Sequence, residues 1–413
     1  MQRFRARVRI ATAGLAFAGS MLAGSAGAEV FYLRSSCAGQ PTPCYTSISS
    51  LNAAVTPRTA ANPLIVDIGP GDFPASGPLS LTCNGTNGFV TYRGAGREHS
   101  RIVAANGGVF QAAVLLNGCQ RLGFQDLTVV GRRYGVIWFS NGTSTWTNVD
   151  VVMATAGDTS VGWTEEFCSA EDPGDHYWFS SRIRVTAKAD SNAGYSAPCA
   201  RSWFFGSEID VIGDESLNAR SNPNLAAVTV SGEGEVQAFG SLIRARSAGA
   251  TTAALNGLDA GVGLATIRIG KTFAGADAAG GMFHAHGTNL TANAATNPGR
   301  NATVLDVRVG AAMAHTFETS FVATPGAGGT GQRILKAAGS TAMLQSPFQW
   351  EATTAPPVDA SENGLDSYVE TDCASTGNCN GGGTQTHLMI YNPAHCGAGN
   401  PWFNVVTGRC RNL

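Results

Sequence analysis

The sequence contains few charged residues and, after residue 28, no long apolar run. Charged residues make up 14% of the 413 residues, whereas globular proteins average about 25%. The formal net charge of −2 provides no basic surface for nucleic acid. After residue 28, no apolar run approaches the roughly 20 residues that a membrane-spanning helix needs. We therefore expect neither a nucleic acid partner nor insertion into a membrane.

The N-terminus has the layout of a signal peptide. Arginines at alternate positions from Arg3 to Arg9 precede an apolar stretch over residues 10–22, and the small residues Ala26 and Ala28 flank a cleavage site. This apolar stretch is too short to span a bilayer. We expect cleavage near Ala28 and a mature protein that is secreted or periplasmic.

The ten cysteines all lie after this segment. An even number of cysteines in an exported chain predicts disulfides. The last four cysteines have His387 and His395 nearby, which leaves a zinc site as the alternative, but they lack the Cys-x-x-Cys pairs typical of structural zinc. We expect disulfides, no metal and no cofactor.

A short sequence pattern repeats through the middle of the chain. Residues 179–185 (FSSRIRV) recur as residues 205–211 (FGSEIDV) and 239–245 (FGSLIRA). The central aliphatic residue of this pattern and of its looser copies is found at positions 127, 149, 183, 209, 243, 267, 290 and 321. Intervals of roughly 20–50 residues are typical of stacked repeats.

Within each repeat, aliphatic residues alternate with polar ones, as in Ile183-Arg184-Val185. This alternation predicts strands with one buried face. When a similar strand returns once in every repeat, successive strands are expected to pair in parallel. The crossover connection between two parallel strands is overwhelmingly right-handed. We therefore predict an all-β fold, a right-handed parallel β-helix.

The repeats, together with residues 64–73 (LIVDIGPGDF) and 90–96 (VTYRGAG), resemble the pectate-lyase-like superfamily of right-handed parallel β-helices. Residues 44–55 predict a short helix with Ser47 as N-cap, similar to the helix that caps the first coil in that superfamily. The resemblance covers residues 30–350 and implies a fold without specifying an activity. We divide the chain into a signal peptide (1–28), a β-helix (29–350) and a disulfide-rich C-terminal cap (351–413).

The polar residues of the repeat are predicted to form outward-facing columns, with neighbouring coils about 4.8 Å apart. One interpretation is an ordinary solvent-exposed sheet face, on which neighbouring opposite charges neutralise each other. The other interpretation is a groove for an extended, anionic ligand. Its candidate ligand-binding residues are Arg184, Asp210, Arg244 and Arg268, with Arg244 and Arg268 expected on adjacent coils.

Asp126 and Asp150 are the candidate catalytic residues. Strand geometry on adjacent coils separates them by about 8 Å, within the roughly 6.5–9.5 Å of an inverting glycosidase pair. The motifs of specific enzymes are incomplete. The paired aspartates of polygalacturonases, the later Asp segment of pectinesterases, and the arginine motif and calcium-binding acids of pectate lyases have no counterpart here.

Aromatic residues and two histidines complete the list of candidates. The tryptophans between residues 138 and 203 form either a sugar-stacking platform or part of the core, and the core is favoured because large aromatics are mostly buried. His284 and His286 alternate on one strand face, but His286 occupies the aromatic position of the repeat, which favours a packing role. Cys168 and Cys199 lie in this aromatic-rich region, and a disulfide is expected to order its insertion over residues 154–176, where a binding site is expected if one exists.

The sequence leaves two functions open. The first is a secreted, non-catalytic β-helix that binds a polysaccharide or cell-surface glycan. The alternative is a glycosidase or lyase acting on an acidic glycan. The oligomeric state stays open.

Overall fold

The computed structural model of the protein describes residues 28–74, 77–83, 87–104, 111–139, 142–155, 159–166, 174–187, 191–214, 224–248, 264–271, 278–296, 300–308, 312–336, 341–345, 352–353, 367–373, 385–391, 396, 402–404, 407 and 409–411. The predicted signal peptide lies outside them up to residue 27, and cleavage near Ala28 stays a prediction. The first strand begins at Glu29.

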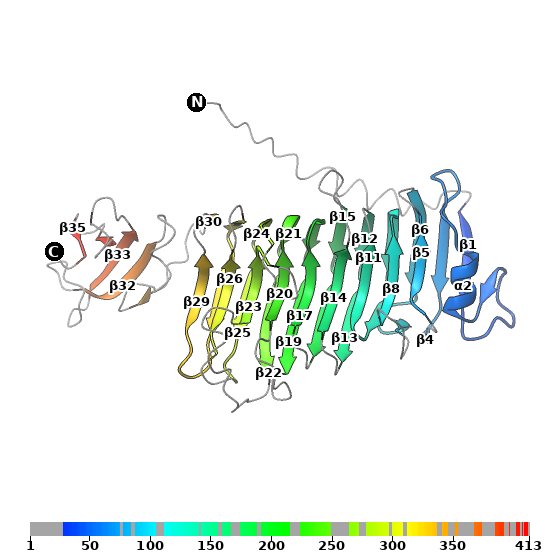
Figure 1. Ribbon diagram of the computed structural model, residues 1–413, viewed down its shortest axis with the longest axis horizontal. Coiled ribbons are helices and arrows are strands. Elements are labelled where there is room, and N and C mark those ends of the chain that lie inside the picture. The colour runs from blue at the N-terminus through cyan, green and yellow to red at the C-terminus, as the bar shows by residue number, and fades with distance from the viewer. Residues whose placement is uncertain are drawn as a thin grey trace, which may run out of the picture.

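Three long sheets form the main body of the molecule (Figure 1). Sheet 1 consists, in spatial order, of β2 (Cys44–Tyr45), β1 (Glu29–Leu33), β3 (Leu64–Ile68), β6 (Asn87–Gly94), β9 (Gln120–Gln125), β12 (Thr143–Thr147), β15 (Asp175–Phe179), β18 (Arg201–Phe205), β21 (Gly232–Phe239), β24 (Gly280–His286), β27 (Met313–Phe317) and β30 (Thr341–Gln345).

The other two long sheets have nine strands each. Sheet 2 consists of β28 (Ser320–Thr324), β25 (Asn289–Asn293), β22 (Leu242–Ala248), β19 (Glu208–Asp214), β16 (Arg182–Ala187), β13 (Asp150–Thr155), β10 (Thr128–Gly131), β7 (Ser100–Val103) and β4 (Gly71–Pro74). Sheet 3 consists of β29 (Gly331–Lys336), β26 (Ala302–Val307), β23 (Leu264–Ile269), β20 (Asn224–Val230), β17 (Ser191–Ala197), β14 (Thr159–Glu166), β11 (Tyr134–Phe139), β8 (Ala112–Asn117) and β5 (Leu79–Thr82).

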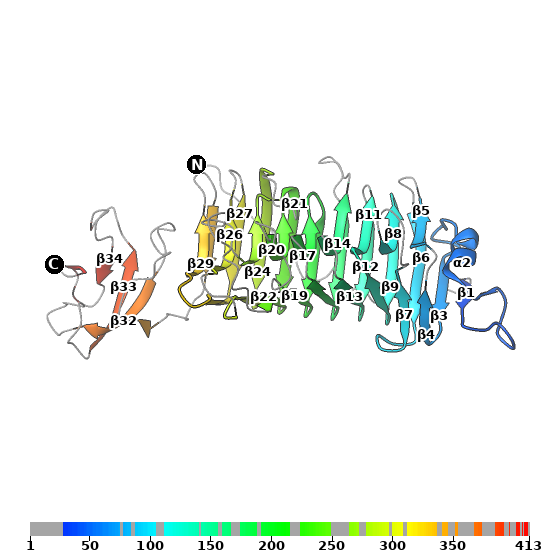
Figure 2. The same cartoon turned by 60° about the horizontal axis from the view of Figure 1, so that its bottom comes forward.

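The chain visits the three sheets in turn, so that β12, β13 and β14 make one coil and β15 starts the next. Every pairing between coils is parallel, as between β12 and β15 or between β13 and β16. Figures 1 and 2 show the coils stacked along one axis. The predicted fold, a right-handed parallel β-helix, is confirmed.

The corner between sheets 1 and 2 has the same two-residue form in seven successive coils. Its first residue always has positive φ, between 48° and 55°. From Ser181 onward the second residue is a buried Ser or Thr, and the hydroxyls link the coils: Ser181 N–H donates to Ser207 Oγ at 3.2 Å, and Ser207 N–H to Ser241 Oγ at 3.2 Å. The seven first residues are Asp126, Asn148, Ser180, Gly206, Gly240, Gly287 and Glu318.

Two details of the predicted repeat are wrong. Ile267 lies on β23 of sheet 3, so a single coil connects Ile243 to Leu290. Leu127 and Val149 lie at corners, and the residues aligned with Ile183 are Val129 and Val151. The physical reason is that all three sheets share one aliphatic alternation, and a shift of two residues leaves every side chain on the same face.

Aromatic rings stack inside the coils from the N-terminal part to the middle. Consecutive ring centroids lie 4.1–5.6 Å apart and all five rings are buried. Trp138 and Trp163 are also fully buried, so the core interpretation is confirmed for these tryptophans, whereas Tyr177 and Trp203 stack at 4.8 Å and are only partly buried. The buried stack consists of Tyr92, Phe124, Trp146, Trp178 and Phe204.

The core also contains a polar cluster. Glu165 and His176 are both fully buried, with His176 Nε2 3.7 Å from Glu165 Oε2. His176 Nδ1 lies 2.7 Å from Ser144 Oγ, which also accepts a hydrogen bond from Trp146 Nε1 at 2.7 Å. These hydrogen bonds satisfy the Nδ1 side of the His176 ring, which lowers the cost of burying it.

The predicted helix is α2 (Ile48–Ala54), which lies at the N-terminal end of the solenoid (Figure 1). Ser47 is its N-cap and accepts a hydrogen bond from Ser50 N–H at 3.1 Å. Ile48 and Leu51 are buried in the core of the first coil. The helix and its cap are therefore confirmed.

Disulfides connect Cys37 to Cys44, Cys83 to Cys119 and Cys396 to Cys410. Cys199 and Cys373 are disulfide-bonded as well. Because Cys373, Cys396 and Cys410 are oxidised, the alternative of a C-terminal zinc site is wrong. Cys168 and Cys379 lie outside the described residues, and so does much of the predicted binding loop.

A fourth sheet follows the solenoid, and its strands bond only to one another among the described residues. Its role as a cap and the boundary at residue 350 stay predictions. No described helix has the length and apolar character to cross a membrane. The sheet consists of β31 (Ala352–Thr353), β32 (Ser367–Cys373), β33 (Gln385–Tyr391), β34 (Trp402–Asn404) and β35 (Arg409–Cys410).

The buried aromatic stack predicts the effect of shortening one of its members. Trp146→Ala removes a fully buried indole between two stacked rings and should lower the free energy of unfolding by about 3–5 kcal/mol. Trp203→Ala, on the partly exposed outer face, is the matched control and should cost less. Urea unfolding followed by circular dichroism measures both, and equal losses would contradict the assigned positions.

Candidate functional site

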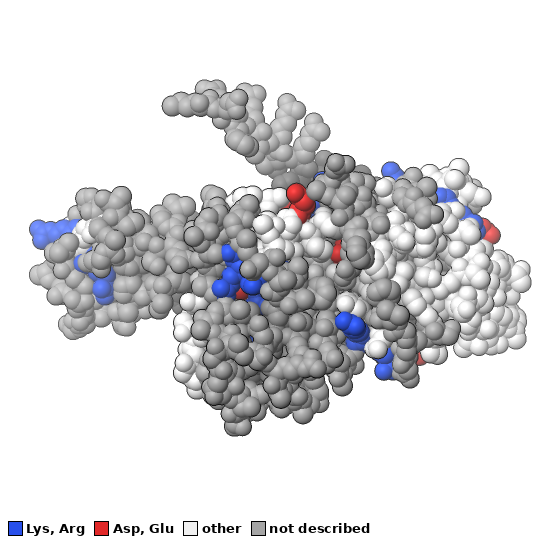
Figure 3. All heavy atoms as spheres, viewed as in Figure 1, with Lys and Arg blue, Asp and Glu red and all other residues white. Residues whose placement is uncertain are grey.

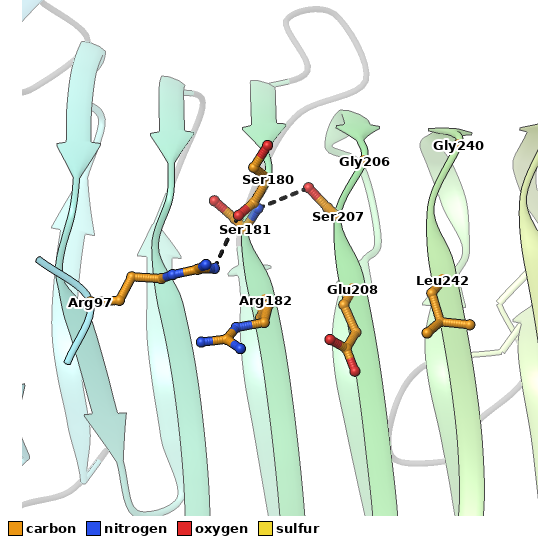
Figure 4. A pocket seen from close by; sticks show the side chains of 9 residues that line it. All are labelled: Arg97, Ser180, Ser181, Arg182, Gly206, Ser207, Glu208, Gly240 and Leu242. Atoms are coloured by element: carbon orange, nitrogen blue, oxygen red, sulfur yellow. Dashed lines mark hydrogen bonds between the residues drawn. The ribbon is translucent and has the colours of Figure 1, made fainter.

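A groove of about 370 Å³ crosses the corner between sheets 1 and 2 in three successive coils. Figure 4 shows Arg182, Glu208 and Leu242 side by side on neighbouring strands, with Arg97 reaching toward the corner from the connection between β6 and β7. The groove is lined by Arg97, Ser180, Ser181, Arg182, Gly206, Ser207, Glu208, Gly240 and Leu242.

Two glycines leave space above the corner. Gly206 has φ +54° and Gly240 has φ +55°, and a Cβ added at either would meet no atom within 4 Å. The equivalent positions of the upstream coils hold Asp126, Asn148 and Ser180 in the same conformation. A short polar side chain is therefore compatible with this backbone, and its absence in two coils opens the groove.

An ion pair cluster forms one end of the groove. Arg182 Nε donates to Asp150 Oδ1 at 2.7 Å and its Nη2 to Asp150 Oδ2, while Arg97 Nη1 lies 3.3 Å from the same carboxylate. Arg97 Nη1 also donates to the Ser180 carbonyl at 3.2 Å. Asp150 is 6% exposed, and its hydrogen bond is the main cause of the raised pKa of Arg182.

Charges alternate along the next outward column of sheet 2. Arg184, Asp210 and Arg244 are aligned across three strands, as predicted. Arg244 Nη2 lies 3.3 Å from Asp210 Oδ2, Arg246 Nε donates to Asp210 Oδ1 at 3.0 Å, and Arg184 Nη2 lies 3.8 Å from Glu208 Oε2. Arg184 is 43% exposed, which makes it the most accessible charge of this column.

The predicted place of Arg268 in this column is wrong. Arg268 lies on β23 of sheet 3, where it is fully buried and its Nε donates to Asp306 Oδ2 at 2.9 Å. It is therefore not adjacent to Arg244 and does not face the groove. Asp150 is also displaced by two residues along the strand, since it aligns with Arg182 instead of Arg184. Both errors follow from the shared alternation of the three sheets.

Asp126 and Asp150 come from neighbouring coils, as the sequence predicted. Asp126 is a corner residue with φ +52° and accepts a hydrogen bond from Asn148 Nδ2. Asp150 is held by the guanidinium groups of Arg97 and Arg182 and is not among the residues that line the groove, so the catalytic role of this pair stays a hypothesis.

A column of aromatic rings runs beside the groove on the outer face of sheet 1. Phe179, Phe205, Phe239 and His286 stack at 5.1 Å with interplanar angles of 7–10°. Each ring directly precedes a corner residue. His286 occupies the aromatic position as expected, although it is exposed.

Sequence reasoning missed Arg97 and the corner glycines. The repeated FGS at residues 205–207 and 239–241 contained the signal for the glycines, because a turn that recurs with Gly beside a small hydroxyl residue indicates positive φ. Nothing near Arg97 in the sequence indicates that it reaches Ser180, at a corner three coils away. On the face of the molecule that Figure 3 draws, the described charged side chains lie in small, separate groups.

No family model matches the chain, and no curated protein sequence matches it. A crystal structure of pectate lyase Pel9A is similar, with a TM-score of 0.45 and 13% identity over 82% of this chain and 83% of that chain. The β-helix assignment rests on the three parallel sheets of this protein itself.

The ion pair cluster predicts that Asp150 supports the fold. Asp150→Asn removes the charge that two arginines bind and should lower the free energy of unfolding by about 1–3 kcal/mol. Asp72→Asn is the matched control, because Asp72 pairs with Arg101 on the same sheet but both are exposed; it should cost below about 1 kcal/mol. If chemical denaturation gave the two variants equal stability, the structural role of Asp150 would be refuted.

Proposed function

We propose that this is a secreted β-helix protein that binds an extended polysaccharide, without cleaving it, along the groove at the corner of sheets 1 and 2. The observation that carries the proposal is the course of the groove. The groove runs along the solenoid axis over three coils. Each coil contributes a corner residue, which is Ser180, Gly206 or Gly240, and one side chain from the strand that follows the corner. An open, repeating groove fits a repeating polymer better than a compact ligand.

The chemistry of the lining supports a sugar ligand. Ser180 is exposed at the corner, and Arg97, Arg182 and Glu208 supply charged donors and acceptors around it. The adjacent aromatic column adds an apolar flank for the C–H faces of sugar rings. A few polar groups beside an apolar wall are typical of small-molecule and sugar sites.

The position of the carboxylates supports binding over catalysis. Asp150 and Asp210 are each 6–7% exposed and each is bound by two arginines. A glycosidase needs two carboxyl groups that face the bond that breaks, and neither Asp150 nor Asp210 is among the residues that line the groove. The disulfides also fit a protein that acts in an oxidising compartment.

Binding is tested by affinity electrophoresis of the purified chain in gels that contain neutral or acidic polysaccharides. The bound polysaccharide is then incubated with the protein while reducing ends and the absorbance of unsaturated uronates are followed. Retardation without new products supports the proposal. New reducing ends alone indicate a hydrolase, and both signals together indicate a lyase; either result overturns the non-catalytic role.

A side chain built into the groove should block it. In the double variant Gly206→Asn, Gly240→Asn, each Asn adopts the backbone conformation that Asn148 already has at the equivalent corner, so the fold should be kept. We expect the affinity for the retarding polysaccharide to fall at least about tenfold, equivalent to about 1.4 kcal/mol.

Gly287→Asn is the matched control. Gly287 has φ +55° and no atom within 4 Å of an added Cβ, but it lies outside the groove lining. Its affinity should equal that of the unmodified protein. A loss of binding that is equal in Gly287→Asn and in the double variant would show that the groove is not the binding site.

A further inference from the structure

Strands β24 and β27 are neighbours in sheet 1, toward the C-terminal end of the solenoid (Figure 2), and each carries a methionine and a histidine at alternate positions. In β24 and β27 the burial alternates, so that every second residue faces outward. The register pairs Met282 with Met313 and His284 with His315. These four residues, which we call the Met–His patch, are all half-buried.

The patch is compact. Aligned residues on neighbouring strands lie about 4.8 Å apart, and alternate residues on one strand about 6.6 Å apart. The rings of His284 and His315 have centroids 5.1 Å apart at an angle of 75°. His284 Nε2 lies 3.7 Å from Glu235 Oε1 on the preceding strand. Two imidazoles, a carboxylate and two flexible thioether side chains therefore border one small area.

This combination of donors is selective. Thioether and imidazole ligands together favour soft copper(I), whereas hard cations such as Ca²⁺ and Mg²⁺ require several oxygen ligands. Within the described residues, no three His, Cys, Asp or Glu side chains converge as a metal site, so the tetrahedral nitrogen and oxygen set that zinc uses is not preformed. The methionines are the ligands that complete a site for a soft ion.

We propose that the Met–His patch binds one copper(I) ion, with His284 and His315 as nitrogen ligands and Met282 and Met313 as sulfur ligands. The site lies on sheet 1 in β24 and β27, whereas the groove is lined by residues no later than Leu242. The two proposals are therefore independent of each other.

The test uses silver(I) as a redox-inert probe of the same ligand preference, so that no reductant endangers the disulfides. The purified chain, with ¹³C-labelled methionine methyl groups, is titrated with silver(I) and followed by calorimetry and by NMR. We expect one tight equivalent and shifts in the Met282 and Met313 methyl signals. Anaerobic competition with a chromophoric copper(I) chelator then extends the result to copper.

The variant Met282→Leu, Met313→Leu keeps the side-chain volume and should weaken silver(I) binding at least about tenfold, as should His315→Gln, in line with losses of about 10–100-fold for altered metal sites. Met153→Leu in the core and His99→Gln outside the patch are the controls and should bind like the unmodified protein. Unchanged affinity in the double Leu variant, unmoved methyl signals, or equally tight binding of zinc would each overturn the proposal.

Discussion

The in-register parallel pairing of successive coils is the constraint on which every other feature of this protein depends. Once each strand is aligned with its neighbour, a residue type repeated in the sequence becomes a column in space. The two-residue corner keeps this alignment, because its first residue takes positive φ and the buried hydroxyls of Ser181, Ser207 and Ser241 bond from coil to coil. The connections at the other two corners of a coil can then differ in length with little effect on the register.

Columns of like residues have physical consequences that differ with chemistry. Aromatic columns are favourable, and the stack that includes Trp146 and Trp178 fills the interior with offset rings. A column of like charges would be costly, and sheet 2 avoids it by alternating arginines with Asp210 and Glu208. The neutralisation that stabilises this face also engages the carboxylates that would otherwise be candidates for catalysis.

The two proposed sites use this architecture in different ways. The groove lies where the corners at Gly206 and Gly240 carry no side chain and Arg97 borders one end. The Met–His patch depends on two pairs of soft ligands that the register brings side by side. Both are features of the solenoid surface that the alignment of neighbouring coils creates.

The sequence by itself determined the solenoid, the capped helix from Ile48 to Ala54 and the presence of disulfides, because alternation, caps and cysteine number are local signals. It also placed Arg184, Asp210 and Arg244 in one column. Only the tertiary structure decided which sheet a strand joins and where each corner falls, since a shift of two residues preserves alternation. That ambiguity misplaced Arg268 and Asp150. Arg97 could not be found at all, because its contacts with Asp150, two coils away, and Ser180, three coils away, are not encoded in any sequence spacing.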